Sequence, residues 1–378
     1  MVAVAECRQY DVQKIKEALR QTLQGIGGWE PYIGKGDTVL LKINLVMSKK
    51  VDAHATSHPA FVQALAELLQ EYGAKVVIGD SPGGLFNSQA LRHVYRGTGM
   101  EQMAKDTGLV LNYNTDTIDV ENPDGKLMKH LTMTAMLKDV DHVISVCKLK
   151  THGMMTYTGA VKNMFGTSPG TVKADYHVRM PKEDEFADAL LDIFLAAKTV
   201  LAFMDAIVGM EGNGPTAGTP RPVGVVLASP DAHQLDQVAA GMIGLSVEQV
   251  PTLRNAAARG LYKPEEVRTV GEDPNRVYVS DYKMPDHIHP DLLRKRLPGW
   301  LADIVSQMTR AKVRFDAKKC VGCGVCASNC PAEVIEMKDH KPHVDYKKCI
   351  RCFCCQELCP KEAVSVKESM IFKLVNRL

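Results

Sequence analysis

The chain contains two runs of cysteine that decide its organisation, Cys320-Val-Gly-Cys323-Gly-Val-Cys326-Ala-Ser-Asn-Cys330-Pro331 and Cys349-Ile-Arg-Cys352-Phe-Cys354-Cys355-Gln-Glu-Leu-Cys359-Pro360. Each run follows the spacing Cys-x2-Cys-x2-Cys-x3-Cys-Pro. The residues before the runs repeat as well, since Phe315-Asp-Ala-Lys-Lys matches Val344-Asp-Tyr-Lys-Lys. Of the 11 cysteines in the chain, all but Cys7 and Cys147 lie in this stretch. The stretch is therefore an internal duplication organised by its thiols.

This spacing is that of a bacterial two-cluster ferredoxin, in which the fourth cysteine of each run ligates the cluster of the other run. We therefore expect two [4Fe–4S] clusters with crossed ligands. Cluster I would be held by Cys320, Cys323, Cys326 and Cys359, and cluster II by Cys349, Cys352, Cys355 and Cys330. Cys354 is an extra thiol inside the second run, and the register of the repeat favours Cys355 as the ligand.

Paired zinc knuckles and a disulfide scaffold are the alternative uses of these cysteines. Structural zinc sites usually divide their ligands into two pairs with a longer spacer, unlike these closely spaced cysteines followed by proline. Disulfides are disfavoured because Met1 to Tyr10 has neither the basic start nor the apolar length of a secretory signal. Iron–sulfur clusters are the better interpretation of both runs.

The bulk composition is that of a soluble globular protein. With 378 residues, 24% of them charged and 45% hydrophobic, the chain is expected to form two or more domains. A net charge of +2 gives no reason to expect nucleic acid as a partner. No apolar run approaches the ~18 residues of a membrane span, so no membrane partner is expected. We expect a cytoplasmic protein, because thiolate clusters are most easily kept intact there.

Strands and helices alternate through the first part of the chain. Val2–Ala5, Thr38–Val46 and Lys75–Ile78 have the short apolar pattern of strands, and helical patterns lie between them. Further strands are expected at Val143–Leu149 and Val200–Met204, each followed by a loop, and a helix is expected at Thr156–Phe165. The order β-α-β-α-β predicts an α/β domain whose mainly parallel sheet has helices on both faces.

The predicted organisation has four segments. An α/β domain covers 1–285, and a helical linker covers 286–311, where Leu297, Trp300 and Leu301 recur at helical spacing. A ferredoxin-like 2[4Fe–4S] domain covers 312–370, and a short tail follows at 371–378.

Polar and glycine residues gather in four stretches, 42–44, 79–84, 148–153 together with 162–165, and 205–215, most of them at or just beyond the carboxyl end of a predicted strand. In open α/β sheets, ligands bind at the carboxyl ends of the strands. The glycine-rich segment 79–84 is either a strand-to-helix turn or an anion cradle, and it lacks the lysine of a Walker-type phosphate loop. Lys148 and Lys150 lie two apart on a strand, so we expect them to point the same way. A desolvated lysine there would have a lowered pKa and would be able to act as an acid.

These features predict a crevice for a small anionic ligand. The predicted catalytic residues are Lys150, His152 and Lys162. Other roles remain open. His152 is alternatively a packed or surface histidine, and Asp205 and Glu211 are alternatively metal ligands. The predicted substrate-binding residues are Lys42, Asn44, His58, Ser81, Gly83, Asn163, Asp205, Glu211 and Asn213.

Several motifs in this part resemble one known family. They are Lys42-Ile-Asn44, Ser57-His-Pro59, Gly79-Asp-Ser-Pro-Gly-Gly84, Lys148-Leu-Lys-Thr-His-Gly153, Gly159-Ala-Val-Lys-Asn-Met-Phe-Gly166 and Asp205-Ala-Ile-Val-Gly-Met-Glu-Gly-Asn-Gly-Pro215. Together they resemble the iron–sulfur family named domain of unknown function 362 over residues 1–285, and the ferredoxin-like module is similar to that of many members. The resemblance implies an α/β domain with a polar centre, often paired with clusters. It implies no particular reaction.

The leading functional hypothesis is an iron–sulfur oxidoreductase that passes electrons through both clusters to a small anionic substrate or a bound cofactor. No nicotinamide or flavin fingerprint is visible, so we expect an external donor such as a ferredoxin-like protein. Two alternative functions are also compatible with the sequence. One is an electron-transfer or accessory protein that docks a partner enzyme, and the other is a non-redox enzyme whose clusters sense redox state.

Overall fold

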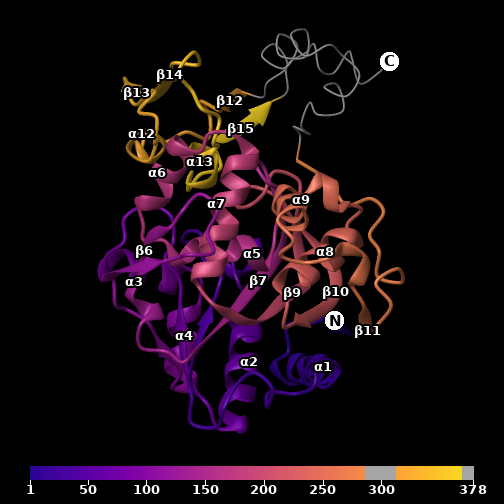
Figure 1. Ribbon diagram of the computed structural model, residues 1–378. Coiled ribbons are helices and arrows are strands. Elements are labelled where there is room, and N and C mark those ends of the chain that lie inside the picture. Colours follow the sequence, from indigo (N-terminus) through magenta and orange to yellow (C-terminus); the bar gives the residue numbers. More distant parts are fainter. Residues whose placement is uncertain (286–311, 368–378) are drawn as a thin grey trace.

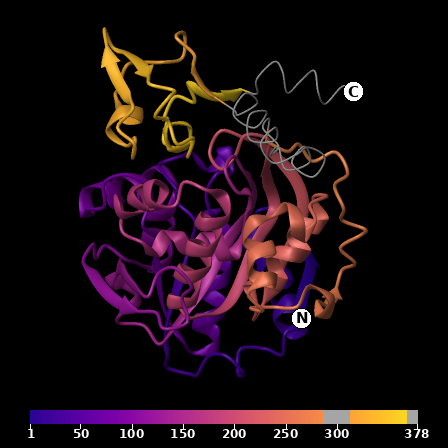
Figure 2. The same ribbon diagram turned by 45° about the horizontal axis from the view of Figure 1, so that its top comes forward.

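The computed structural model describes residues 1–285 and 312–367, which form a large α/β domain and a smaller cysteine-rich module beside it (Figure 1). The predicted linker helix at 286–311 and the tail at 371–378 lie outside the described residues. The module sits against one edge of the domain in both views (Figure 2).

Within the described residues, a 9-stranded sheet forms the centre of the α/β domain, in the order β11-β1-β10-β9-β7-β2-β3-β4 with β8 paired to β7. Strands β9, β7, β2, β3 and β4 run parallel, whereas β10 is antiparallel to both of its neighbours. The expectation of a mainly parallel sheet is confirmed. The strands are β1 (Val2–Glu6), β2 (Thr38–Lys42), β3 (Lys75–Gly79), β4 (Val110–Leu111), β7 (His142–His152), β8 (Thr156–Thr158), β9 (Thr199–Glu211), β10 (Thr219–Ser229) and β11 (Thr269–Gly271).

Helices cover both faces of this sheet, because successive strand residues point to opposite sides and both sides are apolar. In β7, Ile144 and Val146 join one core with the first four helices, whereas Val143 and Cys147 join the cores on the other face. The first group is α1 (Val12–Gly25), α2 (Pro59–Tyr72), α3 (Ser88–Gly97) and α4 (Met100–Thr107). The second is α5 (Ala160–Asn163), α6 (Val172–Arg179), α7 (Glu183–Ala196), α8 (Ala232–Met242) and α9 (Pro251–Ala258).

Helix α2 shows how local sequence sets the ends of an element. His58 is its N-cap, and the Nδ1 atom of His58 accepts a hydrogen bond from the N–H of Ala60 at 3.2 Å. Pro59 follows in the first turn, where its missing N–H has no partner to lose. Gly73 ends the helix with a φ of 109°, a left-handed conformation that glycine adopts without strain.

The module preserves the duplication seen in the sequence. The third cysteine of each run lies in a short helix, Cys326 in α12 (Val325–Ser328) and Cys355 in α13 (Cys354–Glu357). Strands β12 (Lys312–Phe315) and β15 (Val364–Lys367) pair with each other, as do β13 (Ile335–Lys338) and β14 (Lys341–Val344). A separate hairpin of the α/β domain contains β5 (Thr117–Glu121) and β6 (His130–Thr134).

Three predicted boundaries at the carboxyl edge of the sheet are wrong. The segment 150–152 belongs to β7, 205–211 belongs to β9, and 156–158 forms β8 instead of the start of a helix. These strands continue beyond the parallel core because they pair with one another, as Lys148 does with Asp205 and Lys150 with Thr158. Such pairing joins distant segments, so the local pattern of polar and glycine residues does not reveal it.

Candidate functional site

A cavity of ≈ 430 Å³ lies between the carboxyl edge of the sheet and the cysteine-rich module. This volume is ordinary for a small-molecule site, and the edge is where open α/β sheets bind ligands. The α/β domain contributes Lys42, Asn44, Lys150 and Lys162 to its wall, and the module contributes Cys330, Cys354, Glu357 and Leu358. The cavity is therefore enclosed by both parts of the chain.

The structure brings together most of the residues predicted for the crevice. Those that line the cavity are Lys42, Asn44, Ser81, Gly83, Lys150, Lys162 and Asn163. His152 lies against the lining residue Glu357, with its Nε2 atom 3.2 Å from Oε1 of that carboxyl. The remaining predicted residues lie elsewhere, namely His58, Asp205, Glu211 and Asn213.

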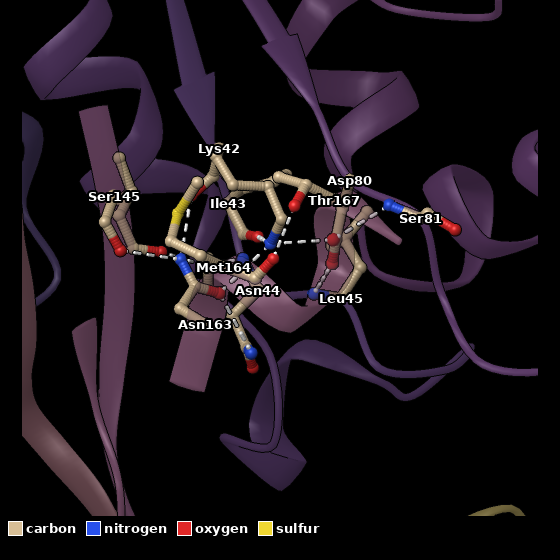
Figure 3. Close-up of polar contacts among 12 residues, drawn as sticks. Lys42, Ile43, Asn44, Leu45, Asp80, Ser81, Ser145, Asn163, Met164 and Thr167 are labelled. Atoms are coloured by element: carbon tan, nitrogen blue, oxygen red, sulfur yellow. Dashed lines mark hydrogen bonds and ion pairs between the residues drawn. The ribbon is translucent and has the colours of Figure 1, made fainter. Parts of the chain in front are cut away.

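Lys42 is the centre of a closed polar network (Figure 3). Its Nζ atom lies 2.7 Å from Oδ1 of Asp80 and donates to the carbonyl of Ile43 at 2.6 Å and to Asn163 at 3.2 Å. Asp80 also accepts from the N–H of Leu45 at 2.7 Å. Because the three N–H groups of the amine are all occupied, Lys42 holds the strand ends together and has no donor left for a ligand.

Helix α5 is fixed at both ends, and this positions Lys162. At its start, Asp236 of α8 accepts from the N–H groups of Ala160 at 2.6 Å and Val161 at 3.0 Å. At its end, the side-chain amide of Asn163 donates to the carbonyl of Lys42 at 2.9 Å. A carboxylate at the N-terminus satisfies backbone donors that the helix itself leaves unpaired.

Lys150 and Lys162 are the amines with capacity for a ligand. Lys150 donates to Oδ1 of Asn44 at 2.6 Å and to the carbonyl of Ala55 at 2.7 Å, which leaves one N–H. Burial, together with the charges of Lys148 and Lys162, lowers the pKa of Lys150 to about 7. Lys162 makes no hydrogen bond or ion pair with the described residues, and burial lowers its pKa as well. These two amines are the candidate anion-binding groups.

Lys173 of α6 lines the same cavity, and sequence reasoning missed it. Its amine donates to the carbonyls of Ser81 and Ser168, each at 2.7 Å, and to Oγ of Ser81 at 2.9 Å. Burial lowers the pKa of Lys173 to about 7. The amine is saturated with neutral acceptors, so it fastens α6 over the loop that follows β3.

That loop was open to two readings, a turn or an anion cradle. The N–H of Ser81 donates to the carbonyl of Gly166 at 3.0 Å, and the N–H of Gly83 donates to the carbonyl of Val46 at 2.8 Å. A backbone cradle must direct free N–H groups at its anion. Because these two groups are used inside the protein, the geometry favours the turn.

Glu357 joins the cysteine-rich module to the lysines of the cavity. Nδ1 of His152 accepts from the N–H groups of Met154 and Met155 at 3.1 and 3.2 Å. The proton of a neutral ring is then on Nε2, which faces Glu357. Burial raises the pKa of Glu357, against the opposing effects of Lys162 and Lys150. Nothing in the sequence indicated this residue, since it lies inside a cysteine run and reaches the cavity only because α13 packs there.

A second polar cluster surrounds Lys148, which is 1% exposed. Its Nζ atom lies 2.9 Å from Oδ2 of Asp205 and donates to the hydroxyl of Tyr10 at 3.0 Å. The ring of Tyr10 stacks on His58 with 3.7 Å between centroids. Lys148 and Lys150 have different partners, and the pairing of β7 with β9 shifts register between them.

The last two predicted ligand residues make structural contacts. Glu211 accepts from the N–H of Lys283 at 3.1 Å. The carbonyl of Asn213 accepts from the side chain of Gln356 in α13 at 2.9 Å, and Thr216 donates to the carbonyl of Glu357 at 2.8 Å. The segment after β9 therefore docks the module against the α/β domain.

Thiols of the two cysteine runs lie near one another in the module. Burial raises the pKa of Cys355, and the nearby thiols Cys352, Cys349, Cys330 and Cys326 raise it further. Cys326 has Cys323 and Cys359 as neighbours in the same way. Among the described residues, no three metal-binding side chains converge closely enough for a single ion.

The two thiol groups differ in exposure. Cys323 is exposed, and the adjacent Val321 is 61% exposed. Cys352 and Cys355 are each 8% exposed and Cys326 is 9% exposed, whereas Cys354 and Cys330 line the cavity. Cys354 also makes a side-chain hydrogen bond with Cys352, and burial adds to the resulting rise in the pKa of Cys354.

The fold and the site define an α/β protein joined to an iron–sulfur electron-transfer module. The profile of the domain of unknown function DUF362 matches residues 39–241, and that of a 4Fe-4S dicluster domain matches residues 312–360. The chain belongs to the DUF362 family and carries a C-terminal 4Fe-4S dicluster domain, as its motifs predicted.

One relative is a thylakoid-associated protein, sll1697, of Synechocystis sp. (strain ATCC 27184 / PCC 6803 / Kazusa). It is 31% identical over 297 residues, which cover 76% of this chain and 89% of the relative. A solved structure, the lactate racemase apoprotein of Thermoanaerobacterium thermosaccharolyticum, aligns with a TM-score of 0.39 and 12% identity. The alignment covers 64% of this chain and 56% of the racemase, and so low a score supports no statement about activity. In the part of the chain that the structure describes, no helix has the length and apolar character to cross a membrane.

Proposed function

We propose that this protein is an iron–sulfur oxidoreductase that passes electrons through two [4Fe–4S] clusters to a small anionic substrate in the cavity. The observation that carries the proposal is the double lining of the cavity. Cys330, a predicted ligand of cluster II, faces it from one side, and Lys150 and Lys162 face it from the other. An electron source and an anion-binding group thus adjoin the same space.

The exposure of the cysteines gives the electron path a direction. Cluster I, beside the exposed Cys323, would receive electrons from an external donor such as a ferredoxin-like protein. Cluster II, with its buried Cys352 and Cys355, would pass them to the substrate. We also propose a cytoplasmic location, where reduced donors of this kind are available.

Each cluster carries one electron at a time, and this sets how the substrate is reduced. A substrate that gains two electrons, delivered one at a time from two reduced donor molecules, also takes up two protons when an unsaturated bond is reduced. Lys150 is placed to give the first proton, because its lowered pKa of about 7 makes its ammonium a usable acid near neutral pH. The second proton comes from solvent through the same amine. Lys162, in its protonated form, would hold the anionic group and stabilise charge that develops on the substrate.

Two alternative functions predict different measurements. A protein that only docks a partner enzyme has no use for an amine without a partner in an internal cavity, and Lys162 is such an amine within the described residues. A redox sensor would change its ligand affinity with cluster state but would consume no electrons.

The test is anaerobic turnover. The reconstituted protein, reduced with dithionite and methyl viologen, is incubated with a panel of small unsaturated carboxylates, and reductant consumption is followed together with product formation. We expect two electrons to be consumed per product, with loss of turnover in Lys162→Met. The surface variant Lys182→Met is the matched control, since that side chain is 78% exposed. If some carboxylates bind but none is reduced, the oxidoreductase proposal is wrong.

A further inference from the structure

One wall of the cavity is built of aromatic rings. His177 of α6 is 5% exposed and stacks on Phe186 of α7, with centroids 4.3 Å apart and ring planes 18° from parallel. Phe165 meets His177 edge-on at 6.0 Å and 87°. His177 and Phe165 both line the cavity. These two rings give the cavity an aromatic surface held in place by ring contacts, on which a flat molecule can stack.

The imidazole in this wall behaves as a neutral ring. Burial, and secondly the charge of Lys162, lowers the pKa of His177 to about 3. Its Nδ1 atom has no hydrogen-bond partner among the described residues, so stacking holds the ring in place. His177 therefore offers a flat surface and adds no second charge beside Lys162.

The amine of Lys162 provides a positive charge at the cavity, next to the aromatic residue Phe165. The Nζ atom of Lys162 lies 5.6 Å from the centroid of the Phe165 ring. Lys150 adds one unused N–H, as described above. Phosphate sites usually supply several backbone N–H groups or a helix N-terminus. In this cavity the N–H groups of Ser81 and Gly83 donate to backbone carbonyls of the protein. A single carboxylate matches this charge better than a phosphate.

The volume of the cavity and the transfer of single electrons from a cluster restrict the chemical class of the ligand further. At ≈ 430 Å³ the cavity lies within the range of small-molecule pockets and has room for a one-ring acid. Electrons from a cluster arrive singly. A conjugated molecule spreads an added electron over several atoms, whereas an isolated bond does not.

We propose that the ligand of this cavity is a planar, conjugated carboxylate, either aromatic or α,β-unsaturated. Its carboxylate meets Lys162, and its flat part lies against His177 and Phe165. This inference names the substrate class of the proposed function and rests on that function for the use of the cavity by a small anion.

The first test needs no variant. Calorimetric titration of the anaerobic full-length protein compares benzoate with cyclohexanecarboxylate, and trans-cinnamate with 3-phenylpropionate, with inorganic phosphate as a second anion. We expect each conjugated acid to bind about five- to tenfold more tightly than its saturated partner, because only the flat molecule stacks on the wall. Phosphate should bind more weakly than benzoate.

Variants then locate the ligand. Lys162→Met should weaken benzoate binding by about tenfold or more, since a charged hydrogen bond is lost, while binding of the neutral analogue benzamide stays unchanged. His177→Leu should remove the preference for flat acids and leave cyclohexanecarboxylate binding close to that of the wild type. Iron content and melting temperature confirm that each variant is folded.

The outcomes separate this inference from the proposed function. Equal binding of flat and saturated acids, or tighter binding of phosphate, overturns the substrate class and leaves the anion cavity intact. Preferential binding of flat acids without any reduction supports the class and contradicts the oxidoreductase. Absence of binding for every probe overturns both.

Discussion

Lys148 and Lys162 are lysines at the same edge of one sheet, and their surroundings are opposite. Lys148 is enclosed with Asp205 and Tyr10, and its charge has a carboxylate 2.9 Å away. Lys162 faces a cavity and makes no ion pair with the described residues. A buried charge with its partner serves the fold, because loss of one member leaves the other uncompensated. A charge without a partner costs stability, and a ligand is the simplest reason for its presence.

The lysines of the cavity wall also differ in whether their amines are fully bonded within the protein. Lys42 is paired with Asp80, and Lys173 is bonded to neutral oxygens of Ser81 and Ser168. Both hold backbone segments in place. Lys150 and Lys162 retain donors for something else. Lining a cavity is therefore insufficient to identify a binding residue, and the saturation of each amine decides its role.

The largest expected effect is on the paired side of this comparison. Lys148→Met should lower the free energy of unfolding by about 3–5 kcal/mol, because Asp205 then remains buried without its partner. Anaerobic chemical denaturation measures this change. The double variant Lys148→Met with Asp205→Leu is the control and should recover most of the loss. A single variant as stable as the wild type would show that the pair is dispensable.

On the unpaired side, Lys162→Met should leave the free energy of unfolding equal to or higher than that of the wild type. No carboxylate within ion-pair distance is orphaned by the change, and a desolvated charge is removed. Iron content should not change. Denaturation measured in parallel with Lys148→Met gives the contrast directly, and a loss as large as that of Lys148→Met would assign Lys162 to the fold.

A smaller effect is expected from pH on the affinity of the cavity for benzoate. The pKa of Lys150 is lowered to about 7, so its amine is charged below that pH and neutral above it. Binding of benzoate, which stays ionised throughout, should therefore weaken as the pH rises from about 6 to about 8, by no more than tenfold for each pH unit. Lys173, with a pKa also lowered to about 7, and Glu357, with a raised pKa, face the same cavity.

The variant Lys150→Met separates these groups in the calorimetric titration. Removal of the amine should flatten the pH profile between these limits. A profile that keeps its slope in this variant would assign the pH dependence to Lys162, whose pKa burial also lowers, or to Lys173 or Glu357.

The smallest effect is expected at Cys354, the thiol that lines the cavity beside the lysines. Cys354→Ala should keep about eight iron atoms per chain, whereas Cys355→Ala should lose or convert cluster II. Iron and acid-labile sulfide analysis of anaerobically prepared protein measures both. Interchanged results would place Cys354 in the cluster and Cys355 at the cavity.

The sequence alone determined the features that depend on local spacing. The two cysteine runs define their module because ligands for a cubane must recur at fixed short intervals. Apolar strands alternating with helical patterns predicted the α/β domain, and residues such as Lys42, Asn44 and Lys150 were expected to be neighbours because they lie at the ends of strands that meet one edge.

The tertiary structure decided which of these residues are free to bind. Lys148 pairs with Asp205, whereas Lys150 donates to Asn44 and lines the cavity. Docking of α13 brings Glu357 and Cys354 to the same space, and α6 adds His177 and Lys173. These contacts join segments far apart in the chain, and their energies depend on register and packing that no local pattern contains. For this reason, the sequence located the site, whereas the fold separated its structural charges from its binding charge.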